Sequence, residues 1–466
     1  MISNTLLLAV FFALAGIFLS NSNNSDEKRV LKGWKRQLNG PAIQYDKVAV
    51  GLNANLDLIV YGTQLLKKLN VAPGPGKDHA VLDSLAELQD AFALSHSSCS
   101  AAERIMTSPT LYKQIVDSAA SLEEKKYFVG GNAALMSQAM VESSPGSQVM
   151  LVGAVGETLR SLLNSTVSVP ESCLQKDDEV HLILEYSRGE KWGDNVASCA
   201  NRFIFSHDVA NGELQPADNF ASALSSFSPQ LVVVAGLHLM DNTEESFWLP
   251  RVKKVLSAIS TLPASTPVHL ELASIGNLDF LARLGSACFS SVQSIGLNEQ
   301  ELMAISKANK GPFHNEELVS GPPEAAVVAD VLYWILKHYS GKLSRVHFHS
   351  LTFHVVAEVA GRWNNSFSAV GAAARVAGRR ACQVEEIDPE KVQLKFPKAF
   401  VRSILDPKLR REPIVVDPNS PVSTWQRDGI NFYLSPVLVC RRPLKTVGLG
   451  DAISATGLLY SHYIPK

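Results

Sequence analysis

The chain has 466 residues, 46% of them hydrophobic and 19% charged, and its formal net charge is −2. This length supports a large core and more than one lobe. The nearly balanced charge excludes a general attraction to nucleic acid, so any phosphate site must be local. No sequence period recurs along the chain, which argues against a repeat architecture.

The N-terminus carries an apolar run from Leu6 to Leu19, and a polar stretch over 20–25 follows it. The length of the run suits a signal-peptide core better than a full bilayer span of about 20 residues. No basic residue precedes the run and several follow it, a pattern that would keep the rest of the chain in the cytosol. We nevertheless expect residues 1–40 to be a signal peptide or membrane anchor plus linker, with delivery to the endoplasmic reticulum lumen or membrane, or secretion.

The run Val48–Val60 predicts a buried strand that ends in polar side chains, where Asn53 and Asp57 can hydrogen-bond hydroxyl groups. Further along, Gly130, Gly131 and Asn132 follow an apolar segment and open a helix. This arrangement predicts a turn lined by backbone N–H groups that could bind a sugar hydroxyl. An ordinary tight turn is the simpler interpretation of these three residues alone.

Short apolar runs alternate with longer helical patterns through the rest of the chain. The runs cover 149–155, 231–239, 268–272 and 346–356, and Ala325–His338 has apolar residues at helical spacing. This alternation indicates an α/β fold in which helices cover both faces of a largely parallel sheet. Ligands of such sheets bind at the carboxyl ends of the strands.

Acidic residues follow two of the predicted strands. Glu271 comes directly after one, and Asn298 and Glu301 come after the next. Each carboxylate alone is an ordinary strand-end or first-turn residue, which the helix dipole favours. Beside a phosphate-binding turn, however, one or two carboxylates suit Mg²⁺, which keeps several of its waters.

The most informative motif runs from Thr446 through Val447, Gly448 and Gly450 to Asp451, where a helix of small residues begins. Glycines allow close backbone approach, and the N–H groups of a helix N-terminus bind anions. Asp451 would sit at this anion site, where a carboxylate can take a proton from an attacking hydroxyl. A plain helix N-cap is the alternative.

The six cysteines have neither CxxC nor metal-ligand spacing, which argues against a zinc module or a disulfide scaffold. In an oxidising compartment we expect one bridge, between Cys382 and Cys440, because both lie in the C-terminal part. The alternative is six buried thiols. Glycosylation sequons begin at Asn23, Asn164 and Asn364, and they matter only if the chain enters the lumen.

In this order, the motifs resemble the ribokinase-like superfamily, whose signature is a C-terminal GxGD with an upstream NxxE. More closely, the chain is similar to the metazoan ADP-dependent glucokinases from about Val48 onward, in segments such as YFVGGNAAL, ANRFIFSHD, GLNEQEL and TVGLGDAISA. The resemblance implies a ribokinase-like three-layer large domain and a smaller α/β lid. Their expected limits are 41–57, 129–159 and 229–466 for the large domain, and 58–128 and 160–228 for the lid.

The resemblance also implies the reaction, which is phosphoryl transfer from ADP to the 6-hydroxyl of glucose with release of AMP. Asp451 is the implied general base. The implied Mg²⁺ ligands are Glu271, Glu301 and Asp451. The implied glucose-binding residues are Asn53, Asp57, Glu103, Gly130, Gly131, Asn132 and His181. The implied nucleotide-binding residues are Arg202 at the phosphates, Asn298, Val447, Gly448 and Gly450, with His349 or His354 near the adenine.

Two other functions stay open at this point. An ATP-using sugar kinase of the same superfamily needs space for a third phosphate, and nothing in the sequence blocks ATP. A lumenal protein that binds a sugar or nucleotide without turnover would have no use for Asp451 as a base. We expect a monomer that binds glucose and ADP, has no nucleic-acid partner, and could attach to a membrane through its N-terminal segment.

Overall fold

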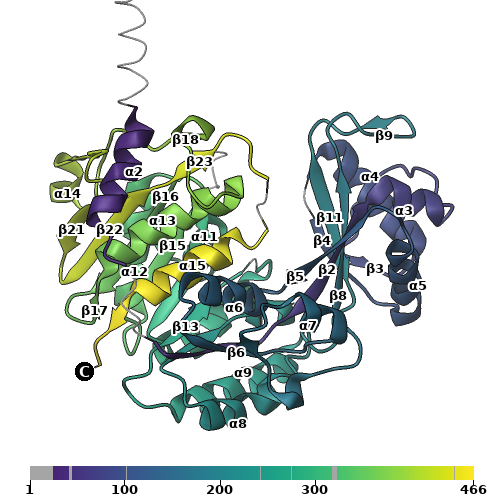
Figure 1. Ribbon diagram of the computed structural model, residues 1–466, viewed down its shortest axis with the longest axis horizontal. Coiled ribbons are helices and arrows are strands. Elements are labelled where there is room, and N and C mark those ends of the chain that lie inside the picture. The colour runs from purple at the N-terminus through teal and green to yellow at the C-terminus, as the bar shows by residue number, and fades with distance from the viewer. Residues whose placement is uncertain are drawn as a thin grey trace, which may run out of the picture. The chain divides into compact units, whose positions relative to one another are not determined.

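The computed structural model describes residues 25–40, 45–100, 102–241, 243–273, 275–316, 323–444 and 447–465 (Figure 1). The apolar run 6–19 and the sequon at Asn23 lie outside these residues. The chain divides into two compact units. The middle unit consists of Lys47–Val141 and Ser147–Leu262, and the C-terminal unit contains Glu142–Gly146 and everything from Pro263 onward, together with the chain up to Asp46. The domain limits expected from the sequence remain a prediction.

The middle unit contains a set of parallel strands and a separate six-stranded sheet. The parallel strands lie in the order β12 (Leu231–Val234), β1 (Lys47–Gly51), β6 (Gln148–Val152) and β7 (Val167–Ser168). They are short and almost completely buried, as expected for a parallel sheet with both faces covered. On them packs α8 (Ala217–Phe227), which also contacts α9 (Glu245–Ser260).

The six-stranded sheet has a helix-covered face. Its strand order is β3 (Val81–Leu82), β4 (Ala102–Met106), β11 (Asn201–Ser206), β8 (Val180–Tyr186), β2 (Asn55–Tyr61) and β5 (Lys125–Gly130). The helices around this sheet are α3 (Gly62–Lys68), α4 (Leu85–Ser98) and α5 (Pro109–Ala120). Phe92, Leu184 and Phe203 belong to the buried core between helices and sheet. The remaining elements that begin in this unit are α6 (Asn132–Ser143), α7 (Glu157–Leu162), η1 (Glu171–Cys173), β9 (Lys191–Trp192), β10 (Asn195–Val196) and η2 (Leu237–Met240).

The C-terminal unit is built on mixed strands, in the order β21 (Ser423–Arg427), β22 (Ile430–Pro436), β16 (Phe353–Val359), β15 (Arg345–His349), β14 (Ser294–Leu297) and β13 (Val268–Glu271). The last three are parallel, and β16, β22 and β21 continue antiparallel. Its main helices are α10 (Leu278–Cys288), α11 (Glu299–Ala308), α12 (Ala325–His338), α13 (Ser366–Cys382) and α15 (Leu449–Tyr460). The predicted α/β fold and the predicted helix over 325–338 are therefore confirmed.

Short elements complete the C-terminal unit. They are η3 (Phe289–Ser291), β17 (Trp363–Asn364), η4 (Pro389–Lys391), β18 (Val392–Leu394), β19 (Ala399–Phe400), α14 (Pro407–Arg411), β20 (Ile414–Val415), β23 (Leu438–Cys440) and β24 (His462–Tyr463). No helix within the described ranges combines the length and the apolar character needed to cross a bilayer.

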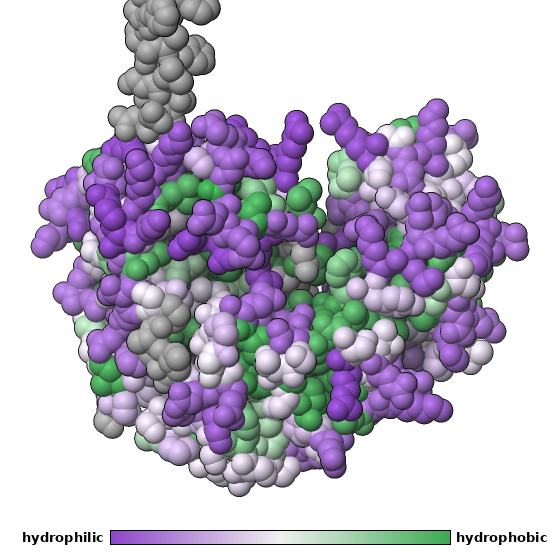
Figure 2. All heavy atoms as spheres, in the orientation of Figure 1, coloured by the Kyte–Doolittle hydropathy of each residue, from purple (hydrophilic) through white to green (hydrophobic). Residues whose placement is uncertain are grey.

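The helix α2 (Asp26–Gln37) differs from the expectation that residues 1–40 form only a leader and linker. Val30 and Trp34 are fully buried in the C-terminal unit, where α2 contacts α13. The Trp34 indole Nε1 donates to Ser435 Oγ at 3.3 Å. The opposite side of α2 is charged, and Figure 2 shows hydrophilic side chains over it. This role was not predicted from the sequence, because basic residues surround the short apolar stripe of α2.

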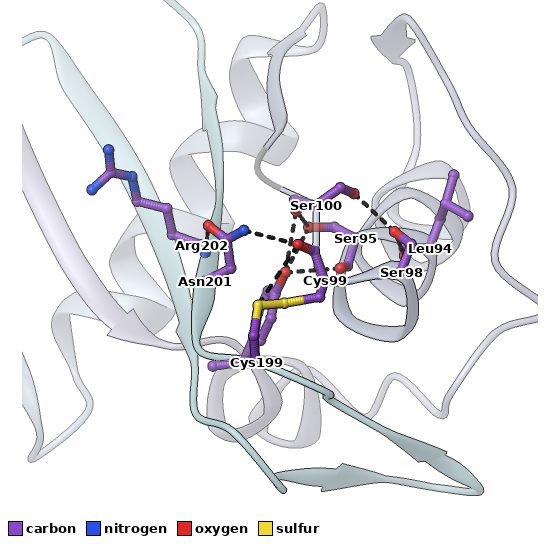
Figure 3. The surroundings of a disulfide bond; sticks show 9 residues. Leu94, Ser95, Ser98, Cys99, Ser100, Cys199, Asn201 and Arg202 are labelled. Atoms are coloured by element: carbon purple, nitrogen blue, oxygen red, sulfur yellow. Dashed lines mark hydrogen bonds between the residues drawn. A yellow bond between two sulfur atoms is a disulfide. The ribbon is translucent and has the colours of Figure 1, made fainter. Parts of the chain in front are cut away.

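Two disulfides are present in the described part of the chain. Cys382–Cys440 joins the end of α13 to β23, with the Cα atoms 5.6 Å apart, and confirms the predicted pair. Cys99–Cys199 joins the end of α4 to the segment before β11, with the Cα atoms 5.8 Å apart (Figure 3). This second pair was not predicted, because cysteines 100 residues apart give no local signal. Cys173 and Cys288 are buried free thiols.

We expect a chain that begins at Ser25 to unfold cooperatively, and a chain that begins at residue 41 to be markedly less stable. In the longer chain, Trp34→Ala should cost about 3–5 kcal/mol, because it empties a buried indole site. Urea unfolding measures both effects. The exposed Lys35→Ala on the same helix is the control, with an expected change within about 0.5 kcal/mol. Equal stability of the Trp34 and Lys35 variants would contradict the packing of α2.

Candidate functional site

The glycine turn before α15 has the geometry of an anion-binding helix N-terminus. Gly448 adopts a left-handed conformation, with φ of 68°, that side chains disfavour. Leu449, Gly450 and Asp451 then form the first turn of α15, and the N–H groups at a helix N-terminus bind anions. A Cβ on Gly450 would lie 3.0 Å from the His349 ring, so glycine also permits close packing there. Val447 precedes this turn and is half-buried.

Glu271 connects this turn to the sheet. Its carboxylate accepts a hydrogen bond from Ser454 Oγ of α15 at 2.9 Å and lies 2.8 Å from His269 Nε2 and 3.5 Å from His349 Nε2. Burial raises the pKa of Glu271, but the hydrogen bonds and charges of His269 and His349 outweigh it and lower the pKa to about 2. His269 is itself held by Ser294 Oγ at 2.9 Å. An ionised, nearly inaccessible carboxylate therefore holds α15 on β13.

Asn298 and Glu301 form a capping box at the start of α11. Asn298 Oδ1 accepts from the Glu301 backbone N–H at 3.1 Å, and Glu301 Oε2 accepts from the Asn298 N–H at 2.8 Å. Burial raises the pKa of Glu301 to about 7, and the charges of Glu271 and Asp451 add to the effect. Three carboxylates thus gather near the α15 turn, and a cation would relieve their repulsion.

The carboxylates suit a hydrated magnesium ion better than direct ligation. No group of three His, Cys, Asp or Glu side chains within the described ranges is arranged to hold a metal. The oxygens of Glu271 and Glu301 already accept hydrogen bonds from protein donors. Mg²⁺ keeps several waters, so these carboxylates fit it through those waters. A cavity of about 530 Å³ lies against Glu301 and is bounded also by Leu272 and Gln300.

In the middle unit, strand register brings four predicted residues to one face of the six-stranded sheet. His181 pairs with Asp57 of β2 and Ser206 of β11, and Ile204, two residues before Ser206, pairs with Glu103. Arg202 is two residues further along β11. Because side chains alternate along a strand, Asp57, Glu103, His181 and Arg202 all project from the face opposite the aromatic core.

Asp57 is buried against glycine. Its Oδ1 accepts from Asn55 Nδ2 at 2.7 Å. Burial raises the pKa of Asp57 to about 6, although the His181 charge opposes the rise. A Cβ on Gly130 would come within 2.1 Å of Asp57 Oδ1, so only glycine fits there. A Cβ on Gly131, which has φ of +83°, would lie 2.8 Å from the Ala54 Cα.

Asn53 and Asn132 organise the start of α6. Asn53 Oδ1 accepts from the Ala133 N–H at 3.1 Å, and its Nδ2 lies 3.4 Å from Asn132 Oδ1. Gly236 approaches Asn53 so closely that a Cβ would lie 2.6 Å from the Asn53 side chain. Part of the hydrogen-bonding capacity expected for a sugar therefore fixes this turn.

His181 has a partner that the sequence analysis missed. Its Nε2 lies 2.6 Å from Asp208 Oδ2, and both side chains are largely buried. Burial lowers the pKa of His181, but the Asp208 charge and hydrogen bond raise it more, to about 10 overall. Asp208 lies in the segment ANRFIFSHD, but nothing in that string shows which residue it contacts. His238, whose pKa burial lowers to about 4, lies near the same pair and was also missed.

Neither His349 nor His354, the two histidines expected near an adenine, lines the cavity beside Glu301 or the one beside Phe353. His349 sits beneath Gly450 and beside Glu271. His354 is completely buried, with its ring centroid 6.4 Å from that of His349. A separate cavity of about 720 Å³ opens at the start of β16, lined by Thr352, Phe353 and residues 395–401 with the start of α12. Three segments that lie far apart in the sequence line this cavity, so no local motif predicts it.

Comparison with known proteins identifies the family. Residues 46–460 match the model described as the ADP-specific Phosphofructokinase/Glucokinase conserved region. The chain is 43% identical to an ADP-dependent glucokinase of Bos taurus, covering 95% of this chain and 89% of that one. It is 35% identical to a probable ADP-dependent glucokinase of Caenorhabditis elegans, covering 95% and 90%.

The fold is similar to that of a hypothetical ADP-dependent phosphofructokinase from Pyrococcus horikoshii OT3, with a TM-score of 0.66 at 15% identity. That alignment covers 90% of this chain and 98% of the other. The α/β fold, the glycine turn and these matches together define a kinase. Within that class, the chain belongs to the ADP-specific phosphofructokinase/glucokinase family.

The fit of Gly130 against Asp57 gives a test of the charged face of the six-stranded sheet, which carries Asp57, Glu103, His181 and Arg202 and is called the sugar-side cluster because the sequence analysis expected sugar-binding residues there. Gly130→Ala should destabilise the protein by about 1–3 kcal/mol, because the new methyl group forces the buried carboxylate out of place. Gly40→Ala, where a Cβ would meet nothing within 4 Å, is the control. Urea unfolding measures both variants. A Gly130 variant as stable as the Gly40 variant would show that Asp57 is not held this way.

Proposed function

We propose that this chain transfers the terminal phosphoryl group of ADP to the 6-hydroxyl of D-glucose and releases AMP and glucose 6-phosphate. The observation that carries the proposal is Asp451 in the first turn of a glycine-led helix, which buried Glu271 holds through Ser454. The 43% identity to an ADP-dependent glucokinase supports the choice of glucose and ADP.

The chemistry of the C-terminal unit follows from charge. Asp451 accepts the proton of the attacking hydroxyl, and the N–H groups at Gly450 and its neighbours stabilise the charge on the transferring phosphoryl group. Glu271 and Glu301 are the residues that would hold the waters of Mg²⁺, which, when bound, neutralises phosphate charge. The cavity beside Phe353 has an apolar lining suited to a purine base, and we propose it as the adenine site.

In the middle unit, we propose that the sheet face with Asp57, Glu103 and His181 binds glucose through its hydroxyl groups. Arg202, half-buried on the same face, suits the nucleotide phosphates because its guanidinium is permanently charged and planar. The N–H groups of the Gly130–Gly131 turn add donors for a sugar oxygen. We propose that the enzyme acts as a monomer.

Product analysis tests the function. The chain beginning at Ser25, supplied with glucose, Mg²⁺ and ADP alone, should form AMP and glucose 6-phosphate in equal amounts. ATP as the sole donor should give little or no product. Turnover with ATP would move the chain to an ATP-using sugar kinase, and no turnover with either donor would favour a protein that only binds.

Asp451→Asn should lower kcat by about 10²–10⁴-fold, since the general base is lost. Glucose binding by calorimetry should stay close to that of the unchanged protein, because the substitution is isosteric and the proposed sugar-binding residues of the six-stranded sheet are unchanged. Asp417→Asn, an exposed change in the same unit, is the control. Near-normal turnover of the Asp451 variant would eliminate the assigned base.

We also propose that the chain is delivered to the lumen of the endoplasmic reticulum, with the N-terminal apolar run as its signal or anchor. Two disulfides support an oxidising compartment. The sequon at Asn164 is fully exposed, and Asn164 Oδ1 accepts from the Thr166 N–H and hydroxyl. In the sequon at Asn364, by contrast, the Ser366 hydroxyl is buried and donates to Glu358.

Expression in animal cells tests this location. An endoglycosidase should shift the protein on a gel by the mass of one glycan or more. Asn164→Gln should remove or reduce that shift, whereas Asn364→Gln should leave it unchanged. Asn364→Gln is the matched control. An unglycosylated, protease-accessible protein in intact microsomes would place the chain in the cytosol instead.

A further inference from the structure

The contact between His181 and Asp208 joins two elements of the middle unit. His181 lies near the start of β8, and Asp208 lies two residues after the end of β11. Their side chains are 12% and 8% exposed, and Nε2 to Oδ2 measures 2.6 Å. Within the described residues, the other ring nitrogen, Nδ1, makes no hydrogen bond. Nε2 of His181 thus contacts a buried carboxylate, and Nδ1 is available to bind a ligand.

The turn that carries Asp208 is fixed on both sides. Glu179 accepts hydrogen bonds from the N–H groups of Val209 and Ala210, at 2.8 and 3.0 Å. Asn211 binds both backbone groups of Ala54, with Nδ2 donating at 3.0 Å and Oδ1 accepting at 3.2 Å. Ala54 directly precedes the strand of Asp57. The position of the Asp208 carboxylate is therefore tied to the sugar-side cluster.

We propose that Asp208 is a positioning residue, which holds His181 by Nε2–H so that Nδ1–H is presented as a donor to a sugar oxygen. This inference rests on the proposed function. It adds the residue that sets the protonation state and the ring orientation of His181. Asp208 itself touches only the protein, and its role is to act through the histidine.

The surrounding charges decide the state of the ring. Asp57 and Glu103 lie on the same sheet face, and Glu179 faces Asp208 from the start of β8. Asp57 and Glu103 favour a protonated His181, Glu179 acts on Asp208, and His238 and Arg202 are the neighbouring basic groups. With Asp208 in place, the pKa of His181 lies near 10, so the ring keeps both protons through neutral pH. Without it, burial is the largest remaining influence and lowers the pKa.

Asp208→Asn should therefore raise the KM for glucose about tenfold or more at pH 8, with kcat changed less than about threefold. The KM of the unchanged protein should vary little between pH 6 and 8.5. In the variant, the KM should fall back as the pH decreases toward 6, because the ring regains its second proton. Steady-state kinetics over this pH range measure both effects.

Asp178→Asn is the matched control. It removes a neighbouring carboxylate that caps α7 by accepting from the Thr158 and Leu159 N–H groups. The control should alter stability without producing a pH-dependent KM. A pH-independent KM in the Asp208 variant, or the same pH dependence in both variants, would overturn the proposal. In a His181→Gln background, Asp208→Asn should add little, because the carboxylate acts through the histidine.

Calorimetry covers the case in which Asp208→Asn does not fold. Glucose binding to the unchanged protein at pH 8, in two buffers of different ionisation enthalpy, should show no proton uptake, because His181 is already protonated. Uptake near one proton would overturn the inference. If the unchanged protein binds glucose but has no kinase activity, the proposed function fails while this binding test still stands.

Discussion

The buried contact between Glu271 and Ser454 is the interaction on which the position of the glycine turn and of Asp451 depends. A carboxylate so thoroughly removed from water is costly unless its charge is compensated. His269 supplies that compensation from the same strand and His349 from the end of β15, and Ser454 supplies a hydrogen bond from α15. The first turn of α15, which contains Asp451, is therefore fixed to the rigid sheet rather than to a loop.

The middle unit also contains buried carboxylates, at the face that we propose binds the sugar. Asp57 is buried beside a glycine that leaves room only for its oxygen atoms, and Asp208 is buried beside the His181 ring, whose protonated form it stabilises. One face of the six-stranded sheet carries a core of aromatic rings, and the other carries the charges. Because the aromatic core makes one face rigid, the closely spaced charged side chains on the opposite face keep fixed orientations.

Much of the site could be predicted from the sequence because its signals are local. The glycines and aspartate of the α15 turn, the Asn298–Glu301 capping box and the apolar stripe of α12 all lie within a few turns of chain. The structure also shows the plainer role of some predicted residues, since Asn298 and Glu301 cap a helix whatever else they do. His349 is part of the Glu271 contact rather than of an open pocket.

The rest depended on pairings between distant segments. Asp208 meets His181 only because β11 and β8 pair in one register, and a shift of one residue would turn both side chains to the other face. The same sheet brings Cys99 and Cys199 together. Trp34 packs beside Ser435, which lies 401 residues away in the sequence. No single stretch of sequence contains these contacts.

The turnover of Ser454→Ala tests the central claim most directly, with Thr456→Val as the control on the same helix. Ser454 bonds to Glu271, whereas Thr456 contacts Ser143 and not the carboxylate cluster. We expect Ser454→Ala to lower kcat about 10–100-fold with the KM for glucose nearly unchanged, and Thr456→Val to leave both close to normal. A Ser454 variant with normal kcat would show that the position of Asp451 does not depend on the buried carboxylate.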